Sequence, residues 1–288
     1  MGDSEMKFRV FLIFVFCLLC SIVQADGQYE NDFSSDANCV ALWRFENGAL
    51  TTDSKGTNTL TSVGTPYATI ITYQEGHASV QLKAAEGDYF SITNANLNAG
   101  FPGKNGDVNK KFTVTCWIAL ESLPGTGDPD YGYRFIANIG ETGKFSWCIT
   151  TNENAGSHYP SLRLGYDNGN SWEDILATGP VLQILHWYHI GITFQDLDKA
   201  YKIRVWDGSN VTETTGNSTN NINIENSSFV IGRVPEGLNG RWDGMIDELV
   251  IFNDILTSDE IDYIRQGTYP TGSPPVSGGG ATVYMGNF

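Results

Sequence analysis

Apolar and polar residues alternate with a period of two along most of the chain, which is the pattern of half-buried β-strands. The clearest run covers 112–118, where every second residue is apolar and falls on one face: Phe112, Val114, Cys116 and Ile118. Similar runs predict strands at 40–45, 80–82, 89–92, 135–139, 144–150, 161–166, 187–194, 201–206, 229–231 and 244–252. This set of strands, separated by Gly-containing turns, predicts an all-β protein: an antiparallel β-sandwich of two packed sheets.

One stretch near the end departs from this pattern. Thr257 can cap a helix, and Glu260, three residues later, can complete a capping box. We expect Ile261, Ile264 and Tyr263 to face the sheet. The sequence therefore predicts one short C-terminal helix.

The first 25 residues differ from the rest of the chain. Lys7 and Arg9 precede an apolar run that is followed by small residues, which predicts a secretory signal cleaved after Ala25. The run is shorter than the roughly 20 residues of a membrane helix. We therefore expect a secreted, extracellular or cell-surface protein with no stable membrane span after cleavage.

The remaining boundaries follow from composition. Residues 26–38 read as a polar lead, 39–269 as a single domain, and 270–288 as a flexible Pro/Gly/Ser linker with a short apolar tail. The tail, 281–288, has strand-like composition. It is either a frayed end or a peptide that adds to a sheet edge of this or a neighbouring molecule, giving self-association.

Charge and cysteine content limit the classes of partner. The net charge is −16, which argues against binding nucleic-acid phosphates and is compatible with neutral glycans and divalent cations. Three cysteines follow the leader: Cys39, Cys116 and Cys148. A Cys116–Cys148 disulfide and buried free thiols are both compatible with the sequence.

Several blocks of the chain occur in the order found in one family. The last is Arg-Trp-Asp-Gly-Met-Ile-Asp-Glu-Leu-Val-Ile-Phe-Asn at 241–253, followed by 256–261; the earlier blocks are 42–48 with 53–56, 112–118, 187–194 with 204–208, and 230–233. Together they closely resemble laminin-G-like (LamG-like) jelly rolls of the concanavalin A-like lectin/glucanase fold. The resemblance spans roughly 38–268 and implies a jelly roll, whereas function is open because this fold hosts lectins, adhesins, receptors and glycosidases.

The resemblance also implies a metal position. Members of this family often hold Ca²⁺ where the first loop meets the last strand, which here would place Asp53, Asn58 and Asp247 near a structural ion. A different reading has Asp53 forming an Asx-turn and Asp247 pairing with Arg44 or Arg241.

Two loops have the composition of a glycan site, with aromatic rings among acids, amides and glycines. The first, 127–134, carries Tyr131 and Tyr133, and the second, 165–174, carries Tyr166 and Trp172. We expect these four side chains to bind carbohydrate, although such aromatics can also simply cap the ends of a sandwich.

The sequence gives little support to catalysis. Glycosidases need two carboxylates roughly 5–10 Å apart, and no strand with closely spaced acids on one face is present. Asp247 and Glu248 are adjacent in a predicted strand, so their side chains should point to opposite faces. His189 lies in an alternating strand and is expected to be structural. We therefore expect a protein that is not an enzyme.

These observations favour a secreted carbohydrate-binding or adhesive module whose partner is a glycan or an extracellular protein. A second hypothesis is a structural or assembly protein of an extracellular layer that uses 281–288, and a third is a divergent glycoside hydrolase or polysaccharide lyase. Three triplets, at Asn210, Asn217 and Asn226, fit the Asn-x-Ser/Thr pattern of N-glycosylation acceptors, which applies in a eukaryotic source.

Overall fold

The computed structural model describes residues 30–123, 133–141, 144–165, 172–224, 226–234 and 240–270. The predicted secretory signal, Tyr131, Tyr166 and the tail 281–288 lie outside these residues. Among the described residues, no helix combines the length and apolar character needed to span a bilayer.

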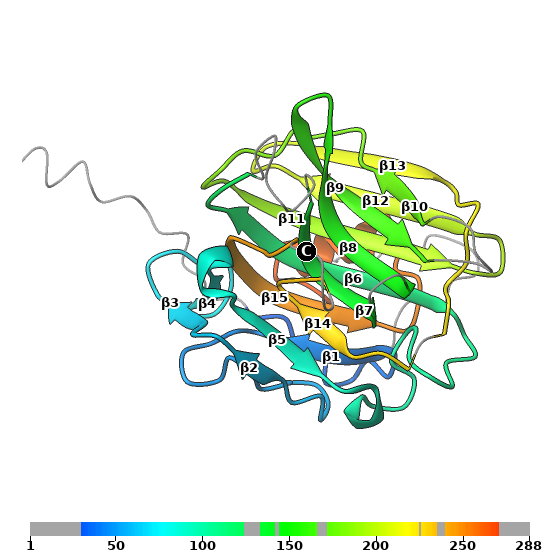
Figure 1. Ribbon diagram of the computed structural model, residues 1–288, viewed down its shortest axis with the longest axis horizontal. Coiled ribbons are helices and arrows are strands. Elements are labelled where there is room, and N and C mark those ends of the chain that lie inside the picture. Colours follow the sequence, from blue (N-terminus) through cyan, green and yellow to red (C-terminus); the bar gives the residue numbers. More distant parts are fainter. Residues whose placement is uncertain are drawn as a thin grey trace, which may run out of the picture.

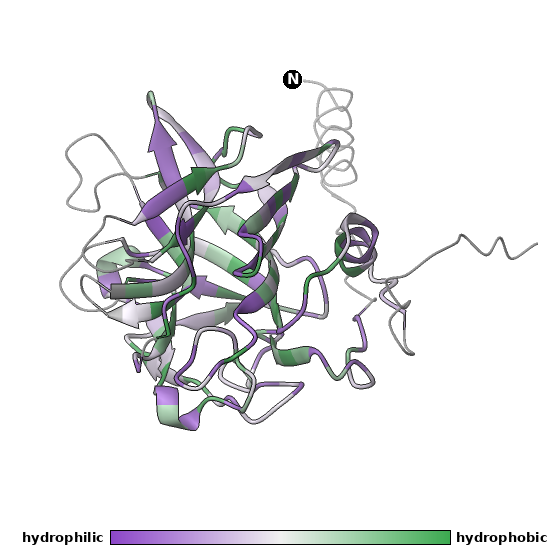
Figure 2. Ribbon diagram, turned by 90° about the vertical axis from the view of Figure 1, so that its right-hand side faces the viewer, coloured by the Kyte–Doolittle hydropathy of each residue, from purple (hydrophilic) through white to green (hydrophobic). Residues whose placement is uncertain are grey.

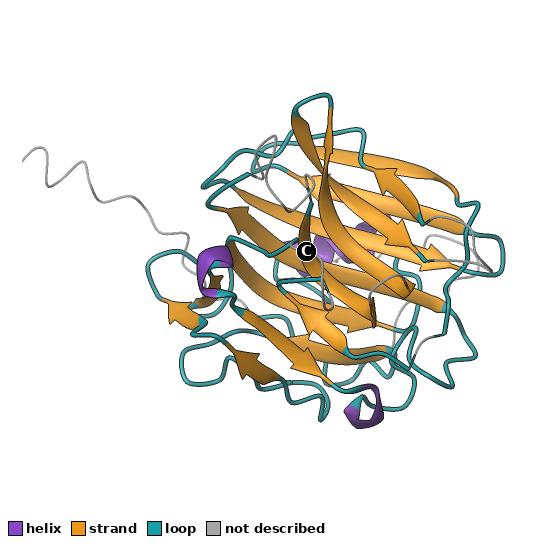
Figure 3. Ribbon diagram, in the orientation of Figure 1, coloured by secondary structure: helices purple, strands orange, loops and turns teal. Residues whose placement is uncertain are grey.

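The chain folds into two antiparallel sheets packed face to face (Figures 1 and 3), as predicted. The strands are β1 (Cys39–Trp43), β2 (Thr61–Val63), β3 (Tyr67–Thr69), β4 (Ser79–Leu82), β5 (Tyr89–Ile92), β6 (Lys111–Leu120), β7 (Arg134–Glu141), β8 (Lys144–Asn154), β9 (Ser157–Leu164), β10 (Glu173–Leu176), β11 (Trp187–Gln195), β12 (Ala200–Trp206), β13 (Val211–Asn217), β14 (Phe229–Ile231) and β15 (Gly244–Phe252). The helical elements are the 3-10 turns η1 (Ala84–Glu86) and η2 (Asn94–Asn96) and the helix α2 (Ser258–Arg265).

Strands far apart in the sequence are neighbours in both sheets. The eight-stranded sheet has the order β13-β12-β11-β6-β15-β4-β3, with β1 also paired to β15, and the seven-stranded sheet has the order β10-β9-β8-β7-β14-β5-β2. Crossovers such as β6 to β15 and β7 to β14 give the Greek-key connections of a jelly roll.

The main core fills the space between the sheets. The four alternating residues of β6 identified above all belong to it, which confirms the predicted face of that strand. Trp43 stacks on Phe229 at 5.3 Å between ring centroids, and Trp147 lies 6.0 Å from the same ring. Hydrophobic and hydrophilic residues accordingly alternate in colour along the strands (Figure 2).

The helix α2 packs on the outer face of the eight-stranded sheet. Thr257 and Glu260 form the predicted capping box, and Ile261 and Ile264 are buried. Tyr263, expected to face the sheet, is instead 43% exposed. A helix advances 100° per residue, so Tyr263 points away from the side that Ile261 and Ile264 share.

The N-terminal segment packs beside this helix. Phe33 is buried between Phe252 and Tyr269, at 5.6 and 5.0 Å between ring centroids. The Asn31 amide donates to the carbonyl oxygen of Ile264 (2.8 Å), and its Oδ1 accepts from the amide of Tyr269 (3.1 Å). The beginning and end of the described chain therefore meet on the same outer face.

The three described cysteines are free and buried. Cys116 points into the main core from β6, whereas Cys148 lies on the outer face of β8 in the other sheet. Burial raises the pKa of each thiol, which leaves the thiolate scarce and the side chains unreactive.

Candidate carbohydrate-binding and metal sites

Asp53 lies in a loop and is saturated with hydrogen bonds. Its carboxylate accepts from five donors: the amides of Leu42 (2.9 Å), Lys55 (2.9 Å), Gly56 (3.0 Å) and Asn58 (3.0 Å), and the Asn58 side-chain amide (2.7 Å). An ionised carboxylate offers about four lone-pair sites, so these donors occupy them all. Asp53 therefore does not fit the role of a cation ligand in this arrangement.

The Asp53 loop closes the outer edge of β1. Asn58 donates to the carbonyl of Val40 (3.0 Å), and the amide of Ser54 donates to the carbonyl of Leu42 (2.7 Å). With the Leu42-to-Asp53 bond, these contacts supply partners that a neighbouring strand would otherwise provide. The structure brings Asp53 and Asn58 together, but gives Asp247 a different set of partners.

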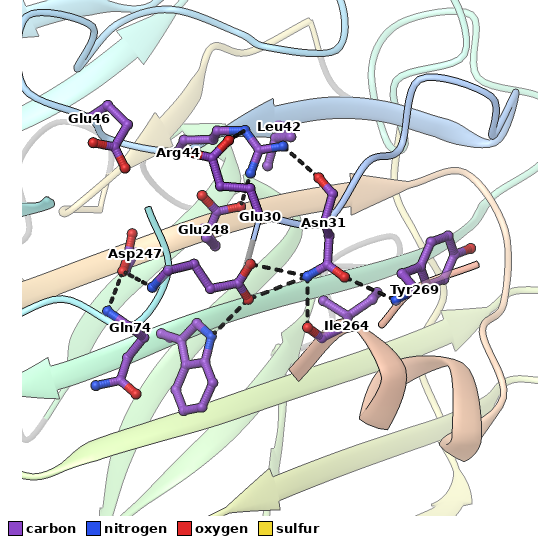
Figure 4. Close-up of polar contacts among 12 residues, drawn as sticks. Glu30, Asn31, Leu42, Arg44, Glu46, Gln74, Asp247, Glu248, Ile264 and Tyr269 are labelled. Carbon is purple, nitrogen blue, oxygen red and sulfur yellow. Dashed lines mark hydrogen bonds and ion pairs between the residues drawn. The ribbon is translucent and has the colours of Figure 1, made fainter. Parts of the chain in front are cut away.

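Asp247 lies at a β-bulge in β15. The register against β6 shifts between Asp247 and Val250, and Glu248 adopts a left-handed backbone conformation with φ of 45°. The expectation that Asp247 and Glu248 point to opposite faces is wrong, because the bulge breaks the strict alternation of the strand. Both carboxylates join one buried cluster (Figure 4).

The carboxylate cluster consists of Glu46, Glu75, Asp247 and Glu248 around Arg44. The Arg44 guanidinium pairs with Glu248 at 3.0 Å, not with Asp247 as one hypothesis had it. Asp247 Oδ2 instead accepts from the amides of Gln74 (2.7 Å) and Glu75 (3.2 Å) (Figure 4). Arg241 is engaged elsewhere, donating to the carbonyl of Ala84.

Glu75 holds the N-terminal segment onto the sheet. Its carboxylate accepts from the Asn31 amide (3.1 Å) and the Trp117 indole (3.3 Å) (Figure 4). Burial raises the pKa of Glu75 to about 7, against the opposing effect of the Trp117 hydrogen bond. Burial likewise raises the pKa values of Asp247 and Glu248 well above their usual range, and repulsion from Glu75 adds to it.

Two oxygens of this cluster, Asp247 Oδ1 and Glu248 Oε1, are buried and make no hydrogen bond. Such orphaned acceptors are costly unless a donor or cation satisfies them. Excess negative charge and free oxygens are the chemistry that Ca²⁺ prefers. The described part of the chain nevertheless holds no group of three or more His, Cys, Asp or Glu already placed around a metal position.

Tyr133 and Trp172, both predicted to bind glycans, meet on the outer face of the seven-stranded sheet. The Arg163 guanidinium lies between them, 4.2 Å from the Tyr133 ring centroid and 4.7 Å from that of Trp172. Both aromatic side chains are half-buried, whereas Arg163 is buried. The structure therefore joins the two aromatic loops of the sequence through a cation that the sequence reasoning missed.

Asp174 fixes the position of this stack. Arg163 donates two hydrogen bonds to its carboxylate, at 2.6 and 2.9 Å, and the Tyr133 hydroxyl donates a third at 3.1 Å. Bidentate pairing holds the guanidinium plane rigidly, so the ring faces are pre-oriented. A signal for Arg163 was present, since it alternates with the apolar residues Leu162 and Leu164 in β9 and must face away from the core.

The residues that contact this stack of side chains are partly apolar and partly polar. Phe135, Phe145, Cys148 and Val234 form a small apolar cluster against which Tyr133 and Trp172 pack. Beside it, the hydroxyls of Thr150 and Ser161 bond to each other at 2.8 Å. We call Tyr133, Arg163, Trp172 and Asp174 the aromatic platform.

The two antiparallel sheets and their crossovers define a jelly-roll β-sandwich. A family model described as the concanavalin A-like lectin/glucanases superfamily matches residues 84–262. The chain belongs to this superfamily, as the sequence blocks predicted. No curated protein matches the chain in sequence.

Solved structures show the same fold at low sequence identity. Domain 4 of AbnA, a GH43 extracellular arabinanase from Geobacillus stearothermophilus solved with arabinotriose, aligns with a TM-score of 0.57 and 17% identity over 80% of this chain and 98% of that one. The botulinum neurotoxin serotype G binding domain aligns with a TM-score of 0.56 and 16% identity, covering 80% of this chain and 51% of that one. The binding domain of Paraclostridial Mosquitocidal Protein 1 gives 0.54 and 19%, covering 79% of this chain and 52% of that one. The chain thus spans about half the length of the two toxin structures.

Proposed function

We propose that this protein is a secreted, non-catalytic carbohydrate-binding or adhesive module. The observation that carries the proposal is the aromatic platform, in which Arg163 and Asp174 hold the rings of Tyr133 and Trp172 in fixed orientation. Aromatic faces stack on the C–H surfaces of sugars, and a rigid platform loses little entropy when it binds.

Charge favours neutral sugars at this platform. Asp174 neutralises Arg163 through two hydrogen bonds, so no unpaired cation is offered to an acidic sugar. The net charge of −16 would also repel anionic glycans. Binding of a neutral glycan agrees with one similar structure, domain 4 of the arabinanase AbnA, which was solved in complex with arabinotriose.

The position of the acids supports a non-catalytic role. Asp247 and Glu75 are buried beneath the N-terminal segment on the outer face of the eight-stranded sheet. The platform lies on the outer face of the other sheet, so a sugar stacked on Trp172 would be remote from these carboxylates. Glycoside hydrolysis requires the two carboxylates to flank the bond that breaks.

The proposal is tested by a glycan array probed with the secreted protein in calcium and in chelator. We expect binding to a defined set of neutral glycans, and at least tenfold weaker binding, about 1.4 kcal/mol, for Trp172→Ala. Tyr263→Ala is the matched control, because Tyr263 is exposed on α2 and far from the platform. Absence of binding under both conditions, or unchanged affinity of a folded Trp172→Ala variant, would refute a lectin role at this site.

We further propose that Ca²⁺ is a structural ion of the carboxylate cluster, retaining Asp247 from the predicted set. The orphaned oxygens of Asp247 and Glu248 support this placement, and Glu46 lies within the same cluster (Figure 4). Ion binding would draw these carboxylates into a ligand set and tie the start of the domain to its last strand.

The calcium proposal predicts a shift in thermal unfolding. Ca²⁺ at a hundredfold excess over Kd should raise Tm by about 5–10 °C, and Asp247→Asn should abolish the shift. Asp53→Asn should lower stability but retain the shift, because Asp53 closes the edge of β1. In chelator, Asp247→Asn should be at least as stable as the wild type, since the amide relieves a buried charge. An equal shift in Asp247→Asn would place the ion elsewhere.

A further inference from the structure

Three Asn-x-Ser/Thr triplets lie within one short part of the chain and have no role in the sites described above. They are Asn210-Val211-Thr212, Asn217-Ser218-Thr219 and Asn226-Ser227-Ser228, and no other asparagine in the sequence has this context. Such triplets are the acceptor pattern for N-linked glycans in secreted proteins.

The three acceptor asparagines differ in solvent exposure from the asparagines that are buried in the fold. Asn210, Asn217 and Asn226 are all exposed. The asparagines that are buried lack the acceptor pattern: Asn31, Asn58, Asn94, Asn138 and Asn152. A bulky, hydrated glycan can therefore be accommodated at every acceptor position without disturbing the core.

Two of the acceptors lie at the two ends of an edge strand. Asn210 immediately precedes β13, and Asn217 is its last residue. β13 is the terminal strand of the eight-stranded sheet (Figure 1), and within the described residues it pairs only with β12. Along it, burial alternates, and the exposed positions are Val211, Glu213, Thr215 and Asn217.

Asn217 lies at the end of β13, next to the turn between β11 and β12. Its amide donates to the carbonyl of Asp198, in the turn between β11 and β12, at 2.8 Å. The following residues are held by Glu173 of β10, which accepts from the Ser218 hydroxyl (2.6 Å) and the Thr219 amide (2.8 Å). Contacts from both sheets therefore fix the chain around Asn217, while its side chain stays exposed.

We propose that Asn210, Asn217 and Asn226 carry N-linked glycans and that the glycans on Asn210 and Asn217 shield the open edge of β13. In the transfer step, the asparagine Nδ2 loses one proton and bonds to C1 of the first sugar. The bond from that sugar to a lipid-linked pyrophosphate breaks, and the lipid pyrophosphate leaves. The proposal rests on the secretion proposed above. It requires a secretory pathway that contains the lipid-linked sugar donor and the enzyme that transfers the sugar to asparagine.

Shielding has a physical reason. An exposed edge strand presents unpaired amides and carbonyls to other chains, and proteins block such edges with charges, bulges or covering groups. β13 carries one charged residue, Glu213, and that carboxylate is engaged by Arg204 and the hydroxyl of Ser258. Two hydrated glycans at the ends of a seven-residue strand would exclude a partner strand from its length.

The test is secretion of the full chain from insect cells in two forms, one with its own N-terminus and one with an established leader before residue 26. Intact mass is measured before and after treatment with a peptide N-glycosidase. We expect three removable glycans. Each of Asn210→Gln, Asn217→Gln and Asn226→Gln should remove one, and the control Asn221→Gln should remove none.

Comparing the two forms shows whether a negative result contradicts the glycan acceptors or the secretory signal. If the form with the established leader is secreted without removable glycans, the acceptor proposal is overturned. If that form carries three glycans while the native N-terminus gives no secretion, the acceptors stand and the proposed secretory signal fails. The shielding role predicts faster aggregation, by light scattering, for the Asn210→Gln/Asn217→Gln variant than for Asn226→Gln. Equal rates would overturn that role.

Discussion

Arg44 and Arg163 each place one guanidinium among acidic groups. The local charge is balanced around Arg163 but remains negative around Arg44. Arg163 faces the single carboxylate of Asp174, so the aromatic platform is close to neutral. Arg44 pairs with Glu248 and lies 3.6 Å from Glu30, whereas the buried acids Asp247 and Glu75 form no ion pair among the described residues. Single residues thus give one outer face a balanced pair of charges and the other an excess of carboxylates.

His189 allows a test of pH dependence at the residue scale. Burial and the positive charge of Arg265 lower its pKa to about 3, below the ordinary value of 6.5. Between these values the unfolded chain binds a proton that the folded protein does not, so this contribution to stability is lost as pH falls from 6.5 towards 3. The slope is at most about 1.4 kcal/mol per pH unit for one proton.

Substitution isolates this contribution from the other titrating groups. His189→Gln should lower the free energy of unfolding at pH 7, and the difference from the wild type should shrink as pH falls to 4. Urea unfolding at several pH values measures it. His77→Gln, at an exposed position, is the control for replacing a histidine by glutamine. A difference between wild type and His189→Gln that is constant with pH would contradict the assignment.

At the element scale, period-two alternation predicted the long strands well because one face of each is buried. Four strands were missed: β2, β3, β10 and β13. Three of them have only three or four residues, and β13, with the sequence Val-Thr-Glu-Thr-Thr-Gly-Asn, has no apolar face to register. These are edge strands, whose pairing is decided by neighbours that local sequence does not identify.

The docking of α2 on β11 depends on a glycine. A Cβ on Gly191 would lie 2.5 Å from Cγ2 of Ile261, so the helix approaches the strand more closely than any other residue would allow. Gly191→Ala should destabilise the protein by about 1–3 kcal/mol through overpacking. Chemical denaturation of the variant measures this loss.

A double-mutant cycle shows whether this contact is the cause. Ile261→Ala alone should cost about 2–5 kcal/mol. The double variant Gly191→Ala/Ile261→Ala should lose less than the sum, because the smaller side chain makes room for the new methyl group. Strict additivity would mean that Gly191 is required for another reason.

The bulge in β15 explains why the sequence did not predict the carboxylate cluster. In a regular strand, Asp247 and Glu248 would point to opposite faces of the sheet. The bulge and the left-handed conformation of Glu248 bring both side chains to the same face. Asp53 and Asn58, predicted as ligands from the resemblance, close the edge of β1 instead. A bulge depends on pairing with β6 and β1, which a single strand cannot reveal.

At the scale of the whole molecule, the sequence predicted the fold class more fully than it predicted the aromatic platform. The jelly roll follows from many alternating segments, each of which supports the others. Tyr133 and Trp172, which the sequence singled out, are half-buried and share Arg163 as a partner, and that contact depends on the register of β9 against β10. That register also sets Glu173 beside Ser218 and Thr219, a link between the two sheets.

The meeting of Asn31 with Ile264 and Tyr269 gives the molecule a front and a back. Both ends of the described chain leave from the side that carries α2, whereas the aromatic platform lies on the opposite side of the sandwich. Glu30 and Pro270, the two ends of the described chain, therefore lie at the back of the molecule, and the aromatic platform with Tyr133 and Trp172 faces forward.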